Sequence, residues 1–281
     1  MASGRSRLYH PRVLLIVDLD GVVYRGAEPV PGMPELLSVR VAAGDQVVYA
    51  TNNSRWHRSE YLDRLRGMGA PADAAHIVTS ARATALALAA GPQPARCVMV
   101  VGGQGLAQEL RDCGIETVAP THFGLEVKPD AVVVGVDFAL RYERLSLAAE
   151  AIRRGARFVA TNRDPVYPGA DALKAGAGSI VAALATAAGR DPDLVVGKPG
   201  PTLFLAAAAA AGVPVESAVV IGDGLQTDIR AAQAVGARSV LMMTGVTNRE
   251  HLDDADPDAH PTAVAHDAAE LAAILAAWAA I

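Results

Sequence analysis

Two aspartates separated by a single residue, Asp18 and Asp20, follow the unbroken apolar run Val13–Val17. Such a run predicts a buried strand, and a carboxylate at its end is costly unless it is paired or binds a metal. Alternate residues of an extended chain point the same way, so both carboxylates can face one ligand. The pair therefore indicates a site for a cation or for acid–base chemistry.

Polar residues also follow three later apolar runs, at positions where a strand would end. They are Thr51 and Asn52 after Gln46–Ala50, Lys198 after Leu194–Val196, and Asp223 and Asp228 after Ala218–Ile221. Taken singly, each has a structural explanation as a helix cap, a turn residue or a solvated lysine. In one parallel sheet, however, the carboxyl ends of the strands share an edge where ligands bind. We therefore expect these residues to form one site.

The chemistry of such a cluster is specific. Three aspartates at one edge would repel one another without a cation, and Mg²⁺ suits a site with few carboxylates and several waters, often beside phosphate. Lys198 adds positive charge, while Thr51 and Asn52 supply donors for phosphate oxygens. Gly21 would let a backbone N–H approach the phosphate closely. One aspartate could then attack phosphorus while the other transfers a proton.

The elements that must hold these residues alternate along the chain. Short β-branched runs followed by helical patterns predict an α/β fold of parallel sheets covered by helices. Further strands are expected at Cys97–Val101, Ala131–Val134, Arg157–Ala160 and Ser239–Met243. Helices are expected at Tyr142–Arg153, Ile180–Ala188, Thr202–Ala211, Ile229–Val235 and Ala268–Ala280.

The composition and charge of the chain argue against several classes of protein and partner. The chain has 281 residues and a net charge of −5 without a long basic run, which argues against nucleic-acid and anionic-membrane partners. No apolar stretch is long enough to span a bilayer, and we expect no signal peptide in residues 1–12. The two cysteines, Cys97 and Cys113, form neither a disulfide framework nor a zinc pattern. We expect reduced thiols and a cytoplasmic protein.

Four ordered motifs, "DLDGVVY", "TNNS", "GKP" and "GDGLQTDI", resemble those of haloacid dehalogenase-superfamily phosphatases. The resemblance runs from Leu14 to about His266 and is closest to subfamily IIA, the NagD-like and 4-nitrophenylphosphatase-like branch. It implies a Rossmann-like core of residues 1–81 and 183–281. It also implies an inserted α/β cap of the C2 type, residues 82–182, that selects the substrate.

The resemblance implies a Mg²⁺-dependent hydrolase of small-metabolite phosphomonoesters, such as sugar phosphates, glycerol phosphate or nucleotides. Asp18 would form an aspartyl phosphate and bind the metal. Asp20 would be the general acid and base, with its carbonyl on the metal. Lys198 would neutralise the nucleophile and the phosphate. Asp223 would be a metal ligand, and Asp228 would act in the outer metal shell.

The same resemblance assigns Thr51 and the backbone of Asn52 to the phosphoryl group. In the cap, the stretch "TNRD" resembles the family's substrate-facing loop, whose residues here are Thr161, Asn162, Arg163 and Asp164. Arg163 could pair with a carboxylate or second phosphate of the substrate, or could be an ordinary surface arginine. The stretch 170–175, "ADALKA", departs from the family pattern. Caps of this kind often contribute to homodimers.

Two alternative functions fit the same motifs, and a third is disfavoured by them. A phosphomutase or phosphotransferase, or a non-catalytic sensor of phosphorylated ligands, could use the same scaffold. Dehalogenation is disfavoured because the dehalogenases of the superfamily lack the second aspartate, which is present here as Asp20. The stretch "VVGGQGL", Val100 to Leu106, lacks the full dinucleotide-binding pattern and predicts a tight strand-to-helix turn instead.

Overall fold

A computed structural model describes residues 13–168 and 172–279. The N-terminal stretch 1–12, on which the signal-peptide prediction rests, lies outside these residues, as do the first two residues of the stretch 170–175. Within the described ranges, no helix has both the length and the apolar character needed to cross a membrane.

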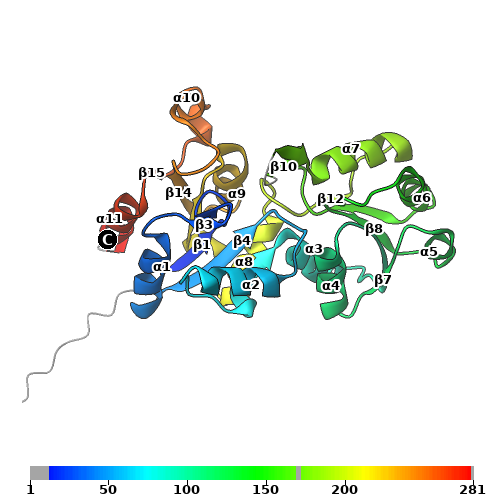
Figure 1. The fold of residues 1–281 in the computed structure, drawn as a ribbon, viewed down its shortest axis with the longest axis horizontal. Coiled ribbons are helices and arrows are strands. Elements are labelled where there is room, and N and C mark those ends of the chain that lie inside the picture. Colours follow the sequence, from blue (N-terminus) through cyan, green and yellow to red (C-terminus); the bar gives the residue numbers. More distant parts are fainter. Residues whose placement is uncertain (1–12, 169–171, 280–281) are drawn as a thin grey trace, which may run out of the picture.

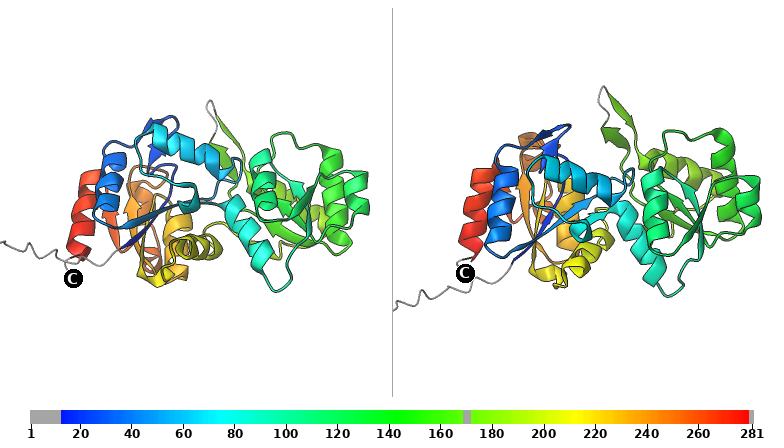
Figure 2. Two further views of the ribbon diagram at one scale, coloured as in Figure 1. Left: turned by 90° about the horizontal axis from the view of Figure 1, so that it is seen from below. Right: turned by 60° about the horizontal axis from the view of Figure 1, so that its bottom comes forward.

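Two parallel sheets, each covered by helices, form two lobes (Figures 1 and 2). The first sheet has the order β15 (Ala263–Ala265), β14 (Arg238–Met242), β13 (Ala218–Gly222), β1 (Leu14–Val17), β4 (Gln46–Thr51) and β5 (Ile77–Thr79). The second has the order β12 (Leu194–Val195), β9 (Arg157–Ala160), β8 (Ala131–Val134), β6 (Cys97–Val101) and β7 (Glu116–Val118). All neighbouring strands in both sheets are parallel, which confirms the predicted α/β class.

Two short antiparallel pairs and the helices complete the described chain. The pairs are β2 (Tyr24–Arg25) with β3 (Glu28–Pro29), and β10 (Val166–Pro168) with β11 (Leu173–Ala175). The helices of the first lobe are α1 (Met33–Ala42), α2 (Arg58–Gly67), α8 (Thr202–Ala211), α9 (Arg230–Ala234), α10 (Arg249–Asp253) and α11 (Ala268–Ala279). Those beside the second sheet are α3 (Ser80–Ala90), α4 (Gln104–Asp112), α5 (His122–Glu126), α6 (Tyr142–Arg153) and α7 (Ala177–Ala188). Short 3₁₀ turns lie at Ala74–His76, Val215–Ser217 and Pro257–Ala259, and a π-helical turn at Leu225–Ile229.

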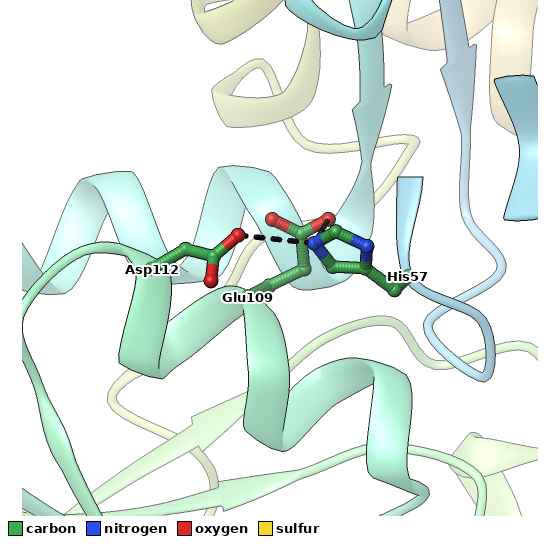
Figure 3. Close-up of side chains that lie close together, drawn as sticks. All are labelled: His57, Glu109 and Asp112. Atoms are coloured by element: carbon green, nitrogen blue, oxygen red, sulfur yellow. Dashed lines mark hydrogen bonds and ion pairs between the residues drawn. The ribbon is translucent and has the colours of Figure 1, made fainter. Parts of the chain in front are cut away.

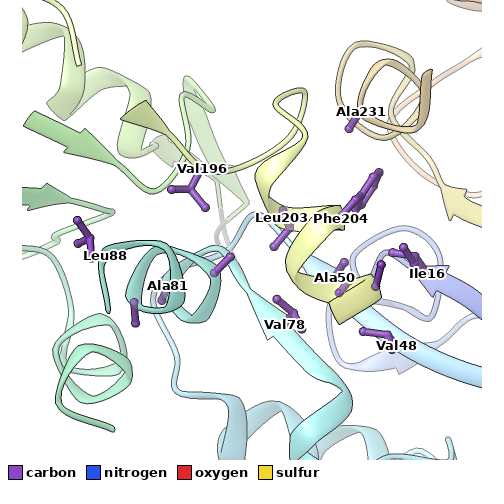
Figure 4. Packing of buried hydrophobic residues seen from close by; sticks show 14 of the residues in the cluster. Ile16, Val48, Ala50, Val78, Ala81, Leu88, Val196, Leu203, Phe204 and Ala231 are labelled. Carbon is purple, nitrogen blue, oxygen red and sulfur yellow. The ribbon is translucent and has the colours of Figure 1, made fainter. Parts of the chain in front are cut away.

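The apolar core alternates along β1 as a strand with two covered faces requires. Leu15 and Val17 pack with α1, α2 and α11, whereas Leu14 and Ile16 face α8. The cluster on the α8 side does not end at the first sheet. Through α3 it continues to one face of the second sheet, so that the two lobes share one hydrophobic cluster (Figure 4).

Most of the predicted elements are confirmed, including the strands Cys97–Val101 and Ala131–Val134 and the helix Tyr142–Arg153. The expectation that all four site-bearing strands share one sheet is wrong for β12. This strand pairs with β9, so the second sheet continues beyond the predicted return to the first lobe at residue 183. Residues 97–196, from β6 to the end of this pairing region, are called the inserted unit below.

Candidate active site

Three aspartates meet at the carboxyl edge of the first sheet. Asp18 follows β1, Asp223 follows β13, and Asp228 lies in the π-helical turn after it. Each is buried, and one carboxylate oxygen from each lies within 4.8 Å of the other two. Asp20, which follows a bend at Leu19, lines the same cavity as Asp18. The structure thus brings Asp18, Asp223 and Asp228 together, and it places Asp20 on the wall of the same cavity.

Lys198 neutralises part of this charge. Its Nζ donates hydrogen bonds to Asp18 Oδ1 at 2.5 Å and to Asp228 Oδ1 at 2.7 Å, and lies 3.4 Å from the carbonyl oxygen of Ala50. The lysine is only 4% exposed, so these contacts replace its hydration. The ammonium group thus links two acids from different strands of the first sheet.

Lys198 reaches the acids from the opposite lobe. It follows β12 of the second sheet, after a Gly197 that packs against Asn52 and Thr161. The Asn52 side chain fixes the Lys198 backbone, accepting its N–H at 2.8 Å and donating to its carbonyl at 3.1 Å. The carboxyl edges of the two sheets therefore face each other across the site. The position of Lys198 after an apolar run was enough to predict it as a site residue. The sheet that carries it depends on strand pairing, which a single sequence does not reveal.

Asp228 is not the cap of the helix that we expected at Ile229. The helical chain begins four residues earlier, in the π-helical turn Leu225–Ile229, and α9 follows from Arg230. Asp228 Oδ2 accepts the N–H of Gly224 at 3.2 Å, which leaves Oδ1 to Lys198. The wide turn thus aims Asp228 back into the acidic cluster.

Two glycines make room for Asp223. A Cβ atom at Gly21 or at Gly245 would overlap the Asp223 carboxylate, and Gly21 also has φ = 82°. Asp223 Oδ2 accepts the Val246 N–H at 2.8 Å. The N–H of Gly21 itself donates to the Tyr24 carbonyl at 2.8 Å, so the predicted close approach of a backbone N–H to the phosphate would fall to another residue. The absence of a side chain at Gly21 leaves room for the Asp223 carboxylate.

Burial and mutual repulsion oppose ionisation of the acids. Burial, with Asp228 and Asp223 adding to it against the opposing charge of Lys198, raises the pKa of Asp18 well above its ordinary value. Burial and the Asp228 charge raise the pKa of Asp223 to about 6. Burial also raises the pKa of Asp20. A divalent cation would reverse this penalty, because ionised carboxylates are its ligands.

The acidic cluster fits the predicted Mg²⁺. Asp18, Asp223 and Asp228 offer converging hard oxygen ligands, and Lys198 compensates only one of their three charges. Because Asp228 Oδ1 is held by the lysine and Oδ2 by Gly224 and Thr227, its geometry suits an outer position. Asp18 and Asp223 are the better placed direct ligands.

The predicted phosphate-binding residues lie beside the lysine. Thr51 ends β4 and lines the cavity, and its Oγ1 accepts the N–H of Asn53 at 3.1 Å. The side chain of Asn52 is engaged with Lys198 and with Asp164, which leaves its backbone as the part available for the phosphate role. Within that backbone, the Asn52 carbonyl already accepts hydrogen bonds from Ser80 Oγ and Asn162 Nδ2, so only the N–H of Asn52 could serve the phosphate.

The four cap residues that we proposed for substrate contact divide into two pairs. Asn162 and Asp164 line the cavity. Thr161 is fully buried behind it and donates from Oγ1 to Ser54 Oγ at 3.1 Å. Arg163 is exposed, points away from the cavity and pairs with Asp191 at 3.1 Å. The geometry therefore supports an ordinary surface arginine and not a substrate contact.

A cavity of about 400 Å³ lies between the two lobes over the acids. Sequence analysis missed several of its lining residues, which are Asn53, Val136, Val166, Tyr167, Leu173, Ala177, Thr227 and Val246. Tyr167 and Leu173 come from the hairpin β10–β11, and Tyr167 O–H lies 3.3 Å from Asn53 Nδ2. Asn53, inside the "TNNS" motif, and Thr227, inside the "GDGLQTD" motif, carried a signal that could have been noticed.

Family models match both parts of the first lobe, and the first of them extends into the inserted unit. A haloacid dehalogenase-like hydrolase model matches residues 15–116, and a HAD-hydrolase-like model matches residues 195–271. The chain is 38% identical over 253 residues to D-glycerol 3-phosphate phosphatase of Mycobacterium tuberculosis, covering 90% of this chain and 69% of that protein. It is 34% identical to 5'-nucleotidase YutF of Bacillus subtilis, covering 85% and 90%.

Solved structures agree with these relatives. The M. tuberculosis glycerol phosphate phosphatase in complex with magnesium superposes with a TM-score of 0.83 at 38% identity, covering 92% of this chain and 77% of that one. The 4-nitrophenylphosphatase of Thermotoga maritima superposes with a TM-score of 0.84 at 32% identity, covering 93% and 97%. The chain belongs to the haloacid dehalogenase-like hydrolase family. Within the family, these relatives place it in subfamily IIA, as its motifs predicted.

Proposed function

We propose that the protein is a Mg²⁺-dependent phosphatase that hydrolyses phosphomonoesters of small metabolites. The observation that carries the proposal is the arrangement of Asp18 and Asp20 in one cavity, with Lys198 bonded to Asp18 and Asp223 beside it. The phosphatase relatives, one solved with magnesium, support the same reaction class.

In the proposed reaction, an Asp18 carboxylate oxygen attacks phosphorus and the bond to the leaving oxygen breaks. Asp20 gives its proton to that oxygen, then takes a proton from the water that hydrolyses the aspartyl phosphate. Lys198 compensates the negative charge of the phosphoryl group. Thr51 and the Asn52 backbone keep that group in position. Bound Mg²⁺ would supply positive charge to the carboxylates and the phosphoryl oxygens.

The raised pKa of Asp20 supports its role as the acid. Burial disfavours the carboxylate form, so that Asp20 holds a proton to a higher pH than an exposed aspartate. Two positive groups, Arg64 and Lys198, act against this shift. A proton donor next to the nucleophile is what departure of an alkoxide requires.

The cavity suggests the kind of substrate. Its floor is charged, whereas Val166, Leu173 and Ala177 line the wall that belongs to the inserted unit. Asn53 and Tyr167 offer polar contacts between floor and wall. We therefore propose that the inserted unit selects small organic phosphates, of the size of glycerol phosphate, a sugar phosphate or a nucleotide.

A panel of phosphorylated metabolites, assayed for release of inorganic phosphate with Mg²⁺ and with excess EDTA, tests the proposal. We expect hydrolysis of at least one class and its loss in EDTA. Transfer of phosphate to a second metabolite without release would instead identify a phosphotransferase. Binding of phosphorylated ligands without any turnover would identify a sensor and contradict the proposal.

We also propose a cytoplasmic location and pairing of two copies. Cys97 and Cys113 are both free thiols, which suits a reducing compartment. Phe123 and Tyr142 of the inserted unit are largely exposed and could contribute to a homodimer contact. Light scattering coupled to gel filtration measures the oligomeric state directly, and a monomer at all concentrations would exclude the dimer.

A further inference from the structure

A buried glutamate joins the inserted unit to the first lobe. Glu109 of α4 is fully buried, and its Oε1 accepts the backbone N–H of Arg58 at 3.0 Å. Its Oε2 pairs with Nη1 of the same arginine, and Arg82 Nη1 lies 3.8 Å away. One carboxylate therefore holds both the backbone and the side chain of the first residue of α2.

The neighbouring groups do not form a metal site. His57, Glu109 and Asp112 lie close together (Figure 3). However, Arg58 already occupies both oxygens of Glu109, and its Nη2 donates to Asp112 Oδ2 at 2.8 Å. His57 Nε2 shares that Asp112 oxygen at 3.0 Å. The cation that this cluster holds is the guanidinium of Arg58.

The segment held by Glu109 leads directly to the phosphate side of the active site. Asn53 N–H donates to Thr51 Oγ1 at 3.1 Å, and Arg55 N–H donates to Asn53 Oδ1 at 3.0 Å. These bonds stiffen the chain from Thr51 to Arg55. Only Trp56 and His57, whose backbone lies against Gly105 of α4, separate this stretch from Arg58.

The helix that carries Glu109 is itself firmly placed. Gly105, one turn earlier on α4, has no room for a Cβ because the backbone of Trp56 and His57 lies against it. Leu106 and Leu110 of α4 are fully buried in the cluster shared by the two lobes. This close approach also explains the "VVGGQGL" stretch, whose Gly105 serves helix packing.

We infer that Glu109 is a positioning residue, which fixes the phosphate-binding segment Thr51–Arg58 from the inserted unit. The inference rests on the proposed function and adds to it a residue distant from the reacting atoms. Without the carboxylate, the Arg58 N–H and Nη1 lose their partner in a buried setting, and the guanidinium keeps only its contact with Asp112. The segment then loses its anchor at Arg58 and keeps the one at Asn52, so the placement of Thr51 and the Asn52 backbone is loosened, whereas the acidic cluster keeps its own contacts.

Isothermal titration of the full chain with inorganic phosphate, in saturating Mg²⁺, tests this inference on Glu109→Gln. We expect the dissociation constant for phosphate to rise about tenfold, as for loss of one hydrogen bond to a charged group. The dissociation constant for Mg²⁺ alone should stay unchanged. In turnover assays the variant should show a raised KM together with a lowered kcat.

Two controls separate positioning from stability. Glu150→Gln removes a carboxylate that pairs with Arg153 and Arg154 on α6, without contact to the segment. Leu184→Ala destabilises the core of the inserted unit. Both should bind phosphate as the wild type does. Wild-type phosphate affinity in folded Glu109→Gln, or an equal loss in Leu184→Ala, would overturn the inference. A wild type without turnover would refute the proposed function alone.

Discussion

Burying several aspartates together disfavours their ionised forms, and the pKa of Asp223 shows how strongly. Burial and the nearby Asp228 raise its pKa to about 6, against an ordinary value of 3.8. In the metal-free protein, the folded state therefore holds this proton more tightly than the unfolded state does. The free energy of unfolding must therefore fall as the pH rises from the ordinary pKa of 3.8 to the raised value of about 6.

Magnesium should reverse that trend. Because the ion binds ionised carboxylates, it competes with protons at low pH and offsets their repulsion at higher pH. We expect saturating Mg²⁺ to raise Tm more at about pH 7 than at about pH 5. Thermal unfolding followed by circular dichroism measures this, with Asp223→Asn as the comparison. An equal rise in Tm at both pH values would contradict the account of the cluster.

At the scale of elements, the site depends on backbone that approaches a carboxylate closely. The turn after β14 passes so near Asp223 that a side chain at Gly245 would overlap it. We expect Gly245→Ala to displace Asp223 and to weaken Mg²⁺ binding about 10- to 100-fold, as changes around metal ligands commonly do. Titration with Mg²⁺ measures this constant.

Gly67→Ala is the matched control for Gly245→Ala. Gly67 ends α2, and a Cβ there would meet open space. We expect it to leave Mg²⁺ affinity unchanged. If Gly245→Ala also binds Mg²⁺ normally, the turn after β14 does not shape the metal site.

Elements were predicted well where local pattern decides them, and less well where distant pairing does. The apolar run before Asp18 and the two-residue spacing of the acids were enough to place both in one cavity. The sheet that carries Lys198 depends on β12 pairing with β9, which no local pattern specifies. The direction of Arg163 was likewise open, because its partner Asp191 comes from a separate segment.

At the scale of the molecule, the two lobes are not independent. The shared cluster runs from Ile16 of the first sheet through α3 to Val133 of the second. Phe204 of α8 is buried in this cluster (Figure 4). The inserted unit therefore rests on the first lobe through a common core, in addition to the polar contacts around Asn52.

Shared burial predicts that the lobes unfold together. We expect a single calorimetric transition whose van't Hoff and calorimetric enthalpies agree. Phe204→Ala should lower the stability of the whole chain by about 3–5 kcal/mol, since it opens a cavity in the shared cluster. Two separate transitions in the wild type, only one of them shifted by the substitution, would show that the lobes are uncoupled.

The central claim is that Asp18 is the nucleophile of a metal-dependent phosphatase. Phosphate release by Asp18→Asn, on the best substrate of the panel and with saturating Mg²⁺, tests it most directly. The account predicts a loss of at least about a thousandfold in kcat, with the fold retained by circular dichroism. The exposed control Asp63→Asn should keep full activity. Turnover by folded Asp18→Asn within about tenfold of the wild type would contradict the claim.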